Sequence, residues 1–397
     1  MIPRSDVLVV GAGLIGTSTA LHLRWRGLTV RVLERDRLGD GTSARGGGWV
    51  AAQSRPAGPH LALALASIAY FPELLDRIGD DCGYLRCGSL VVLESDEQLA
   101  LRRAFVEQQR ANPSYDGVEF LDARALHDLE PAISDRAHSA TYRAADGQID
   151  PPRLLRGLVT AGKRAGVSFH FGAGVTAVDR RGSGWVAQTP VGAFAADVLV
   201  NAAGVWSPRL AEMVGTTLPV SPVAGQMMMT APRERFVNTA IGVFTQGRRD
   251  SDSVVRDIRQ GWDGRVWLGT TIHPDSWSAD VSEVDTKGIR AGLEPLFPGI
   301  AGAVIEEAWA GVRPNPVDRL PILGAQEGVP GYYVGVPMAG ICESAATGKA
   351  LAELISAGTT GVPIAGLSPD RFALGGGVAE RRLEAVHAVG NREGGNQ

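Results

Sequence analysis

The chain has 397 residues, of which 44% are hydrophobic and 21% are charged, and its formal net charge is −4. This length predicts two or three domains, and the composition is typical of a packed globular protein and excludes a largely disordered one. The small net charge argues against a chain-wide affinity for nucleic acid, and the odd set of three cysteines excludes a disulfide framework.

The beginning of the chain reads as strand, turn, helix and strand. Residues 6–10 form a short apolar run typical of a strand buried on both faces, and residues 14–26 have the spacing of a helix. Residues 28–33 predict a second strand, which ends in Glu34. Neither a basic leader with a cleavage site nor an apolar run of about 18 residues accompanies these elements. We therefore expect no signal peptide, no transmembrane segment and a cytoplasmic location.

The middle of the chain is expected to change from mixed elements to mostly antiparallel sheet. Helices are predicted over residues 60–78, 96–110 and 154–165, and strands over residues 89–94, 167–171 and 197–201. Residues 218–310 are rich in β-branched and aromatic residues with turn signals between them, which indicates antiparallel strands. A strand over residues 332–336 and a helix over residues 344–355 follow.

The first glycine motif is Gly11-x-Gly13-x-x-Gly16, between the first strand and the first helix. In a dinucleotide-binding fold these glycines allow a tight turn, a close approach of backbone to pyrophosphate and close packing of helix on strand. The helix N-terminus adds free N–H groups for the phosphates, and Glu34 would accept hydrogen bonds from the ribose hydroxyls. The pattern predicts a dinucleotide site without separating NAD from FAD. The alternative is a glycine-rich turn with an exposed Glu34.

A second glycine-rich segment runs from Gly41 to Trp49. It offers hydroxyl groups, a cation and several backbone amides that no side chain shields, which suits a large ligand extending from the first motif. The alternative is a flexible surface loop, but a large aromatic residue within the glycines argues against it.

Three later segments complete a resemblance to a known family. They are residues 197–210, residues 309–324 around Arg313, and residues 335–355. Together with the two glycine segments, they make the chain similar to the D-amino-acid-oxidase-type FAD oxidoreductases. That group includes glycine oxidase, monomeric sarcosine oxidase and the D-amino-acid dehydrogenases. The resemblance extends over residues 6–372.

The resemblance implies an α/β fold with a Rossmann-type FAD-binding domain and a second, α+β substrate domain built on a mostly antiparallel sheet. We expect the FAD-binding domain over residues 1–81, 146–217 and 311–372, and the substrate domain over residues 82–145 and 218–310. Residues 373–397 are expected to form a loosely held C-terminal tail.

The resemblance also implies non-covalent FAD. Relatives that attach flavin covalently use a Cys or a His, whereas Val312-Arg313 and Arg45-Gly46 stand at those positions here. Cys342 lies in the flavin loop, where a small packed thiol is the favoured interpretation. The predicted FAD-binding residues are Gly11, Gly13, Leu14, Ile15, Gly16, Glu34, Arg35, Thr42, Ser43, Ala44, Arg45, Gly47, Gly48, Trp49, Val175, Ala203, Gly204, Trp206, Arg313, Ala339, Gly340, Ile341 and Cys342. The amides of Gly340 and Ile341, just before a helix, would stabilise negative charge on the N1–C2=O edge of the flavin. No metal site is expected, because no pattern such as HExxH occurs.

The predicted substrate-binding residues are Arg313, Met338, Gln53 and His273. Arg313 matches the family's carboxylate-binding arginine, and a guanidinium forms a bidentate pair with a carboxylate, although a structural salt bridge is the alternative. Residues 336–338 lack the second polar or basic contact that the family often has, which indicates a pocket partly formed by Met338. Gln53 follows the second glycine segment, and for His273 an ordinary turn histidine is the favoured interpretation.

These features predict an FAD-dependent amino acid or amine oxidase or dehydrogenase. A hydride would pass from the substrate C–H bond to flavin N5, and water would hydrolyse the resulting imine. The expected partners are a small-molecule amine or amino acid and an electron acceptor, either O2 or a quinone or other electron carrier. No nucleic acid is expected, and a homo-oligomer is compatible with the sequence. Two alternatives stay open: an FAD-dependent 2-hydroxy-acid dehydrogenase, and a flavoprotein subunit that needs a partner for turnover.

Overall fold

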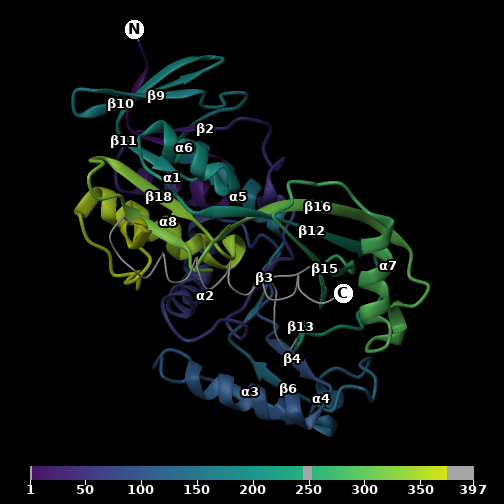
Figure 1. The fold of residues 1–397 in the computed structure, drawn as a ribbon. Helices are drawn as coiled ribbons and strands as arrows, with labels where there is room; N and C mark the ends of the chain where they lie inside the picture. The colour runs from purple at the N-terminus through teal and green to yellow at the C-terminus, as the bar shows by residue number, and fades with distance from the viewer. Residues whose placement is uncertain (1, 245–252, 373–397) are drawn as a thin grey trace, which may run out of the picture.

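The computed structural model describes residues 2–244 and 253–372, so the expected tail at residues 373–397 lies outside the described residues. Within those ranges the strands form two eight-stranded sheets and one two-stranded sheet (Figure 1). None of the described helices is both long and apolar enough to cross a membrane.

The first eight-stranded sheet has a parallel centre. Its path is β17-β18-β11-β1-β2-β8, and β10 and β9 extend it from β11. β1 pairs in parallel with both β11 and β2, where Val9 lies opposite Val200 and Val32. The strands are β1 (Arg4–Val10), β2 (Val30–Leu33), β8 (Ser168–His170), β9 (Ala177–Arg181), β10 (Gly184–Thr189), β11 (Gly192–Asn201), β17 (Ile322–Ala325) and β18 (Tyr332–Val336).

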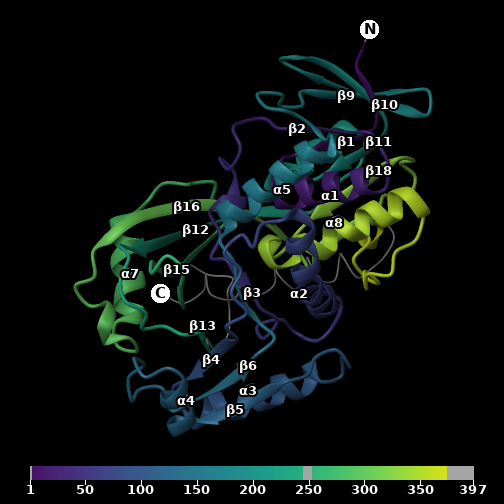
Figure 2. The ribbon, with the colours of Figure 1, turned by 180° about the vertical axis from the view of Figure 1, so that it is seen from behind.

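Helices cover this sheet because its central strands are apolar on both faces. Val7 and Val9 pack in one cluster with residues of α1 and α8, whereas Leu8 and Val10 pack in another with Leu210 of α6. α1 lies between α5 and α8, and α2 packs on α8 (Figure 2). The helices are α1 (Leu14–Trp25), α2 (Pro59–Ile78), α5 (Pro151–Ala165), α6 (Ser207–Met213) and α8 (Gly340–Ala357), and short 3-10 turns lie at Thr42–Ala44, Gly204–Trp206, Pro298–Ile300 and Pro369–Phe372.

The second eight-stranded sheet is mostly antiparallel, in the order β16-β12-β15-β14-β13-β4-β6-β5, with one parallel pair between β13 and β4. Its strands are β4 (Ser89–Leu93), β5 (Val118–Asp122), β6 (Ser139–Arg143), β12 (Val220–Thr230), β13 (Ala240–Val243), β14 (Ser253–Gln260), β15 (Val266–Pro274) and β16 (Ile305–Pro316). The helices α3 (Asp96–Gln109), α4 (Ala123–Leu129) and α7 (Glu283–Leu293) pack on it. A two-stranded sheet of β3 (Trp49–Val50) and β7 (Gly147–Gln148) lies near both larger sheets (Figure 1).

Two features differ from the sequence expectations in detail. β16 belongs to the second sheet and continues to Pro316, beyond the predicted domain boundary at residue 311; the domain ranges themselves stay a prediction. α8 begins at Gly340 rather than near Ser344. The earlier start is stabilised by the Glu343 carboxylate, which accepts hydrogen bonds from the amides of Met338 and Ala339 just before the helix.

Candidate active site

A cavity of about 620 Å³ lies where the turns of the first sheet meet one face of the second sheet. All of the residues predicted to bind FAD or substrate line this cavity, except Gly16, Ala44, Gln53 and His273. The structure therefore brings together segments that are more than 300 residues apart in the chain, such as those of Gly11 and Arg313. These residues are placed at the cavity surface, and the binding of FAD or substrate by each of them stays a prediction.

The first glycine turn has the backbone geometry that a close ligand requires. Gly11 has a φ of +106°, and a Cβ there would clash with the carbonyl oxygen of Ala202. Gly16 does not line the cavity, because it lies under the helix, where a Cβ would clash with the carbonyl oxygen of Gly11. The hydroxyl of Ser43 accepts a hydrogen bond of 3.0 Å from the amide of Leu14. The turn, the helix N-terminus and the second glycine segment thus meet at one place, as phosphate binding requires.

The second glycine segment connects the two sheets. The Thr42 hydroxyl donates to the carbonyl oxygen of Val312 on β16, and the Arg45 guanidinium donates to Ala310 over 2.8 Å. In return, the indole N–H of Trp309 donates to the carbonyl oxygen of Arg45 over 2.9 Å. Ala44 does not line the cavity; it is half-buried and packs against a hydrophobic core cluster. The segment is therefore an ordered wall of the cavity and not a flexible surface loop.

The second sheet contributes the wall opposite the glycine turns. The lining residues of β12 and β14 alternate along each strand, so they share one face of the sheet. The lining residues of β12, β14 and β16 are Val223, Gly225, Met227, Val255, Asp257, Gly311, Arg313 and Pro314, and β15 adds Thr270, Thr271 and Ile272. Arg313 and Asp257 are the two charged residues of this set. Sequence reasoning missed Asp257, although the alternation along β14 is the signal that could have found it.

Asp257 lies beside an aromatic residue of the opposite wall. Oδ1 of Asp257 and the ring of Trp49 both lie within 4 Å of the point where a side chain at Gly242 would begin. At another part of the cavity, the Arg35 guanidinium lies 4.2 Å from the ring centroid of Trp206, and both residues were predicted from the sequence. The cavity thus combines charged groups with flat aromatic surfaces.

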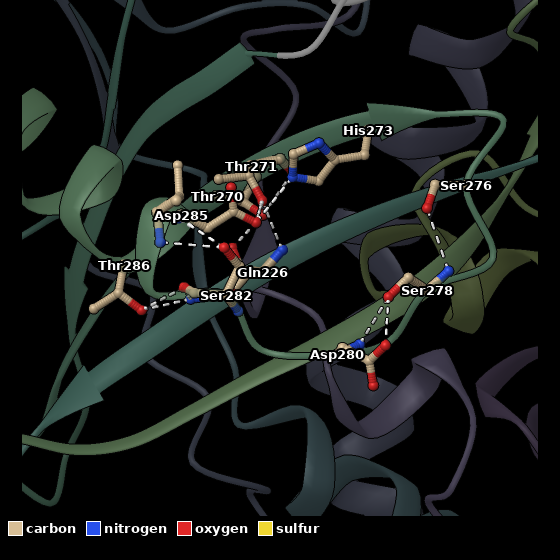
Figure 3. A network of polar contacts seen from close by, with 11 residues as sticks. Gln226, Thr270, Thr271, His273, Ser276, Ser278, Asp280, Ser282, Asp285 and Thr286 are labelled. Atoms are coloured by element: carbon tan, nitrogen blue, oxygen red, sulfur yellow. Dashed lines mark hydrogen bonds and ion pairs between the residues drawn. The ribbon is translucent and has the colours of Figure 1, made fainter.

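His273 turns away from the cavity toward α7. Its Nε2 lies 2.9 Å from Oδ2 of Asp285, and the same oxygen accepts a hydrogen bond of 3.3 Å from the hydroxyl of Thr271 (Figure 3). Thr271 itself lines the cavity. The Gln226 amide binds Ser282 in the same network, which joins β12 and β15 to the start of α7 (Figure 3). The structure therefore places His273 behind the wall and within strand β15, not in the turn that the sequence analysis favoured.

Gln53 is also placed behind the wall. Its side chain is 2% exposed and donates to the carbonyl oxygen of Ser89 over 2.7 Å. Its Oε1 accepts hydrogen bonds from Arg102 and Thr141 at 2.9 and 2.8 Å. These bonds use both ends of the amide, so Gln53 joins the segment after β3 to the second sheet and has no group that points to a ligand.

Three residues at the end of the cavity near α8 were not expected from the sequence. Glu343 is fully buried and binds the amides of Met338 and Ala339, and Nε2 of His60 lies 2.6 Å from its Oε1. Arg55 lines the cavity beside them. Burial alone would raise the pKa of the Glu343 carboxyl, but His60, Arg55 and the Met338 amide together hold that pKa below its usual value. Glu343 is therefore an anion at neutral pH.

The residues present fit FAD. Gly11 and Gly46 both line the cavity, and a Cβ there would clash with the Ala202 carbonyl oxygen or with the Ile341 side chain, so both positions keep a bare backbone that a flat ligand can approach. Glu34 lies at the cavity edge beside the first turn, as ribose binding requires, and the first turn of α8 presents N–H groups at the other end.

Comparison with known proteins establishes the family. A family model described as FAD dependent oxidoreductase (DAO) matches residues 6–354. The chain belongs to this family. The predicted FAD cofactor and the predicted FAD-dependent oxidoreductase are thereby confirmed.

Two curated relatives match nearly the whole chain. Hydrogen cyanide synthase subunit HcnC of Pseudomonas aeruginosa is 31% identical, over 92% of this chain and 96% of the relative. Glycine oxidase of Geobacillus kaustophilus is 29% identical, over 94% of this chain and 98% of the relative. The crystal structure of the latter enzyme superposes with a TM-score of 0.85 at 28% identity and covers 93% of this chain and 99% of its own. The predicted α/β fold is confirmed by that match.

Proposed function

We propose that this FAD-dependent oxidoreductase oxidises the amine of a substrate that carries a carboxylate, namely an amino acid or an N-substituted amino acid. The observation that carries the proposal is the position of Arg313 on the cavity face of β16, in the same cavity as both glycine segments. A guanidinium at that position forms two parallel hydrogen bonds with a carboxylate and so fixes the orientation of the substrate. The relatives named glycine oxidase favour an amine over a 2-hydroxy acid.

The chemistry divides between the cofactor and the chain. Bound FAD would supply the acceptor for a hydride from the C–H bond next to the amine. The chain's own contribution is to bind, orient and dehydrate the substrate: Arg313 holds the carboxylate, while Met227 and Met338 give the cavity apolar walls that exclude water. The amine reacts in its neutral form, so that its lone pair stabilises the developing imine, and the imine is hydrolysed after release.

An anaerobic screen tests this function. The holoprotein is mixed with amino acids, N-methyl amino acids, simple amines and 2-hydroxy acids, and the loss of flavin absorbance is followed without any acceptor. We expect reduction by carboxylate-bearing amines and not by 2-hydroxy acids of the same size. Reduction by a hydroxy acid alone would overturn the proposal. If neither amines nor 2-hydroxy acids reduce the flavin, the protein would instead be a flavoprotein subunit that needs a partner for turnover.

The proposal extends to the acceptor and the location. We propose that the electrons pass to O2 or to a quinone or other electron carrier, that the protein works in the cytoplasm, and that its substrate is a small molecule. An oxygen electrode separates the two kinds of acceptor, because only an oxidase consumes O2 when the amine is added without a dye. Size-exclusion chromatography with light scattering tests the proposed homo-oligomer.

A further inference from the structure

A buried arginine lies in the cavity next to the first turn of α8. Arg55 follows β3 in the chain, is 7% exposed and lines the cavity. Its guanidinium donates to the carbonyl oxygen of Ala51, and the Sγ atom of Cys342, in the first turn of α8, lies 3.7 Å from that same oxygen. The cation is therefore held against the N-terminal end of the helix.

A buried anion and a histidine lie beside this arginine. Nε2 of His60 donates a hydrogen bond of 2.6 Å to Oε1 of Glu343, so it does not accept one from Nε of Arg55, which lies 3.3 Å away. The charge of the Glu343 carboxylate attracts the Arg55 cation. Glu343 in turn accepts the amides of Met338 at 3.1 Å and of Ala339 at 3.0 Å. The arrangement links the segment after β3, the start of α2 and the loop before α8, so a shift of any one of them would disturb the others.

This arrangement determines which positive groups face the cavity at this end. Two of the loop amides are used by Glu343, which leaves the first-turn N–H groups of Gly340 and Ile341 and the Arg55 cation to face a ligand. In a site with little water, one buried positive charge changes the energy of a nearby anion far more than it would at the surface. Negative charge accumulates on the N1–C2=O edge of FAD when it takes up electrons.

We propose that Arg55, held by the Ala51 carbonyl oxygen and by the charge of Glu343, supplies positive charge to the N1–C2=O edge of FAD and thereby raises the reduction potential of the cofactor. The proposal rests on FAD occupying this cavity and not on the identity of the substrate. Its failure would therefore leave the proposed amine oxidation untouched. Arg55 lies two positions beyond Gln53, the residue of this segment that the sequence analysis predicted to line the pocket.

The test is the midpoint potential of the holoprotein, measured against reference dyes with no substrate present. We expect Arg55→Gln to lower the equilibrium constant for two-electron reduction by about tenfold, which corresponds to about 30 mV. The matched control is Arg102→Gln, because Arg102 is another buried arginine, 2% exposed, that binds Gln53 and Thr141 and does not line the cavity. Its potential should equal that of the wild type.

Three results would overturn the proposal. The potential of Arg55→Gln could equal that of the wild type, or Arg102→Gln could lower the potential equally. Alternatively, Arg55→Gln could raise KM for carboxylate-bearing substrates at an unchanged potential, which would assign Arg55 to the substrate.

If Arg55→Gln yields no holoprotein, Arg55→Lys replaces it. A buried lysine loses its proton below its usual pKa, so the potential of this variant should fall below that of the wild type as the pH rises from about 7 to about 10. A potential that follows the wild type at every pH would contradict the proposal.

Discussion

Oε2 of Glu34 accepts a hydrogen bond of 2.7 Å from the backbone N–H of Ala12. The acid at the end of β2 is thereby joined to the turn between β1 and α1, and its other oxygen accepts the amide of Asp36 at 3.1 Å. Each carboxylate oxygen has a second lone pair, so both remain able to accept from a ribose hydroxyl at the cavity edge.

Replacing Glu34 with Gln should weaken FAD binding. The substitution keeps one acceptor but loses the charge, so the affinity should fall by about 1.5–3 kcal/mol. Fluorescence titration of the apoprotein with FAD measures this change, and the thermal unfolding of the apoprotein serves as the control for the fold. An unchanged affinity would show that Glu34 stabilises the turn between β1 and α1 and does not bind FAD.

FAD should leave the protein on acid precipitation. The positions where relatives attach flavin carry Val312, Arg313, Arg45 and Gly46, and none of these is a Cys or a His. Burial raises the pKa of the Cys342 thiol to about 11, so this residue stays a protonated, unreactive thiol at neutral pH. Yellow supernatant and a colourless pellet are expected. Flavin that stays with the washed pellet would establish a covalent bond and refute the prediction.

Gly16→Ala should abolish FAD binding or the fold. A Cβ at Gly16 would meet the backbone oxygen of Gly11, which cannot move without breaking the turn. Gly41→Ala is the control: Gly41 is a glycine of the second glycine-rich segment that lines the cavity, and a Cβ there has no atom within 4 Å. Flavin content and circular dichroism distinguish the two variants. Equal flavin occupancy in both would mean that α1 can shift away from β1 at little cost.

Arg313→Ala should lower kcat/KM for carboxylate-bearing amines, by an amount that corresponds to a loss of about 2–5 kcal/mol in transition-state stabilisation. The flavin content should change little. Arg313→Lys should recover only part of this loss, because an ammonium lacks the planar fork that pairs with a carboxylate. Rates with an amine that lacks a carboxylate provide the control and should change little. If Arg313→Ala loses FAD or unfolds, Arg313 has the structural role that the sequence analysis left open.

The stability of the protein should fall in mild acid because of His22. Desolvation in the core lowers the pKa of His22 from 6.5 to about 4. Between these two values the unfolded chain binds the proton and the folded chain does not, so the unfolding free energy falls as the pH falls, by about 3 kcal/mol in all. Denaturant unfolding at pH 7 and pH 4.5 measures the loss. The His22→Gln variant should lose less unfolding free energy between these two pH values than the wild type. An equal loss in the variant and the wild type would contradict the assignment of this pH dependence to His22.

Several features could be predicted from the sequence because they depend on neighbouring residues. The Gly11 and Gly16 turn, the apolar strand before it and the acid after β2 belong to one local unit, whose geometry follows from the absence of a Cβ and from the apolar run. The antiparallel character of the second sheet followed from its composition in the same way.

Only the tertiary structure decided which side chains reach the cavity. Gln53 and Arg55 lie two positions apart, yet Gln53 binds Ser89 behind the wall while Arg55 lines the cavity. Asp257 enters the cavity because β14 pairs with β15, and α8 starts at Gly340 because Glu343 is held by His60, which is 283 residues away in the chain. The physical reason is that local patterns determine backbone conformation and burial periodicity. The partner of a buried polar group is set by distant segments, which must satisfy its hydrogen bonds and its charge once water has been removed.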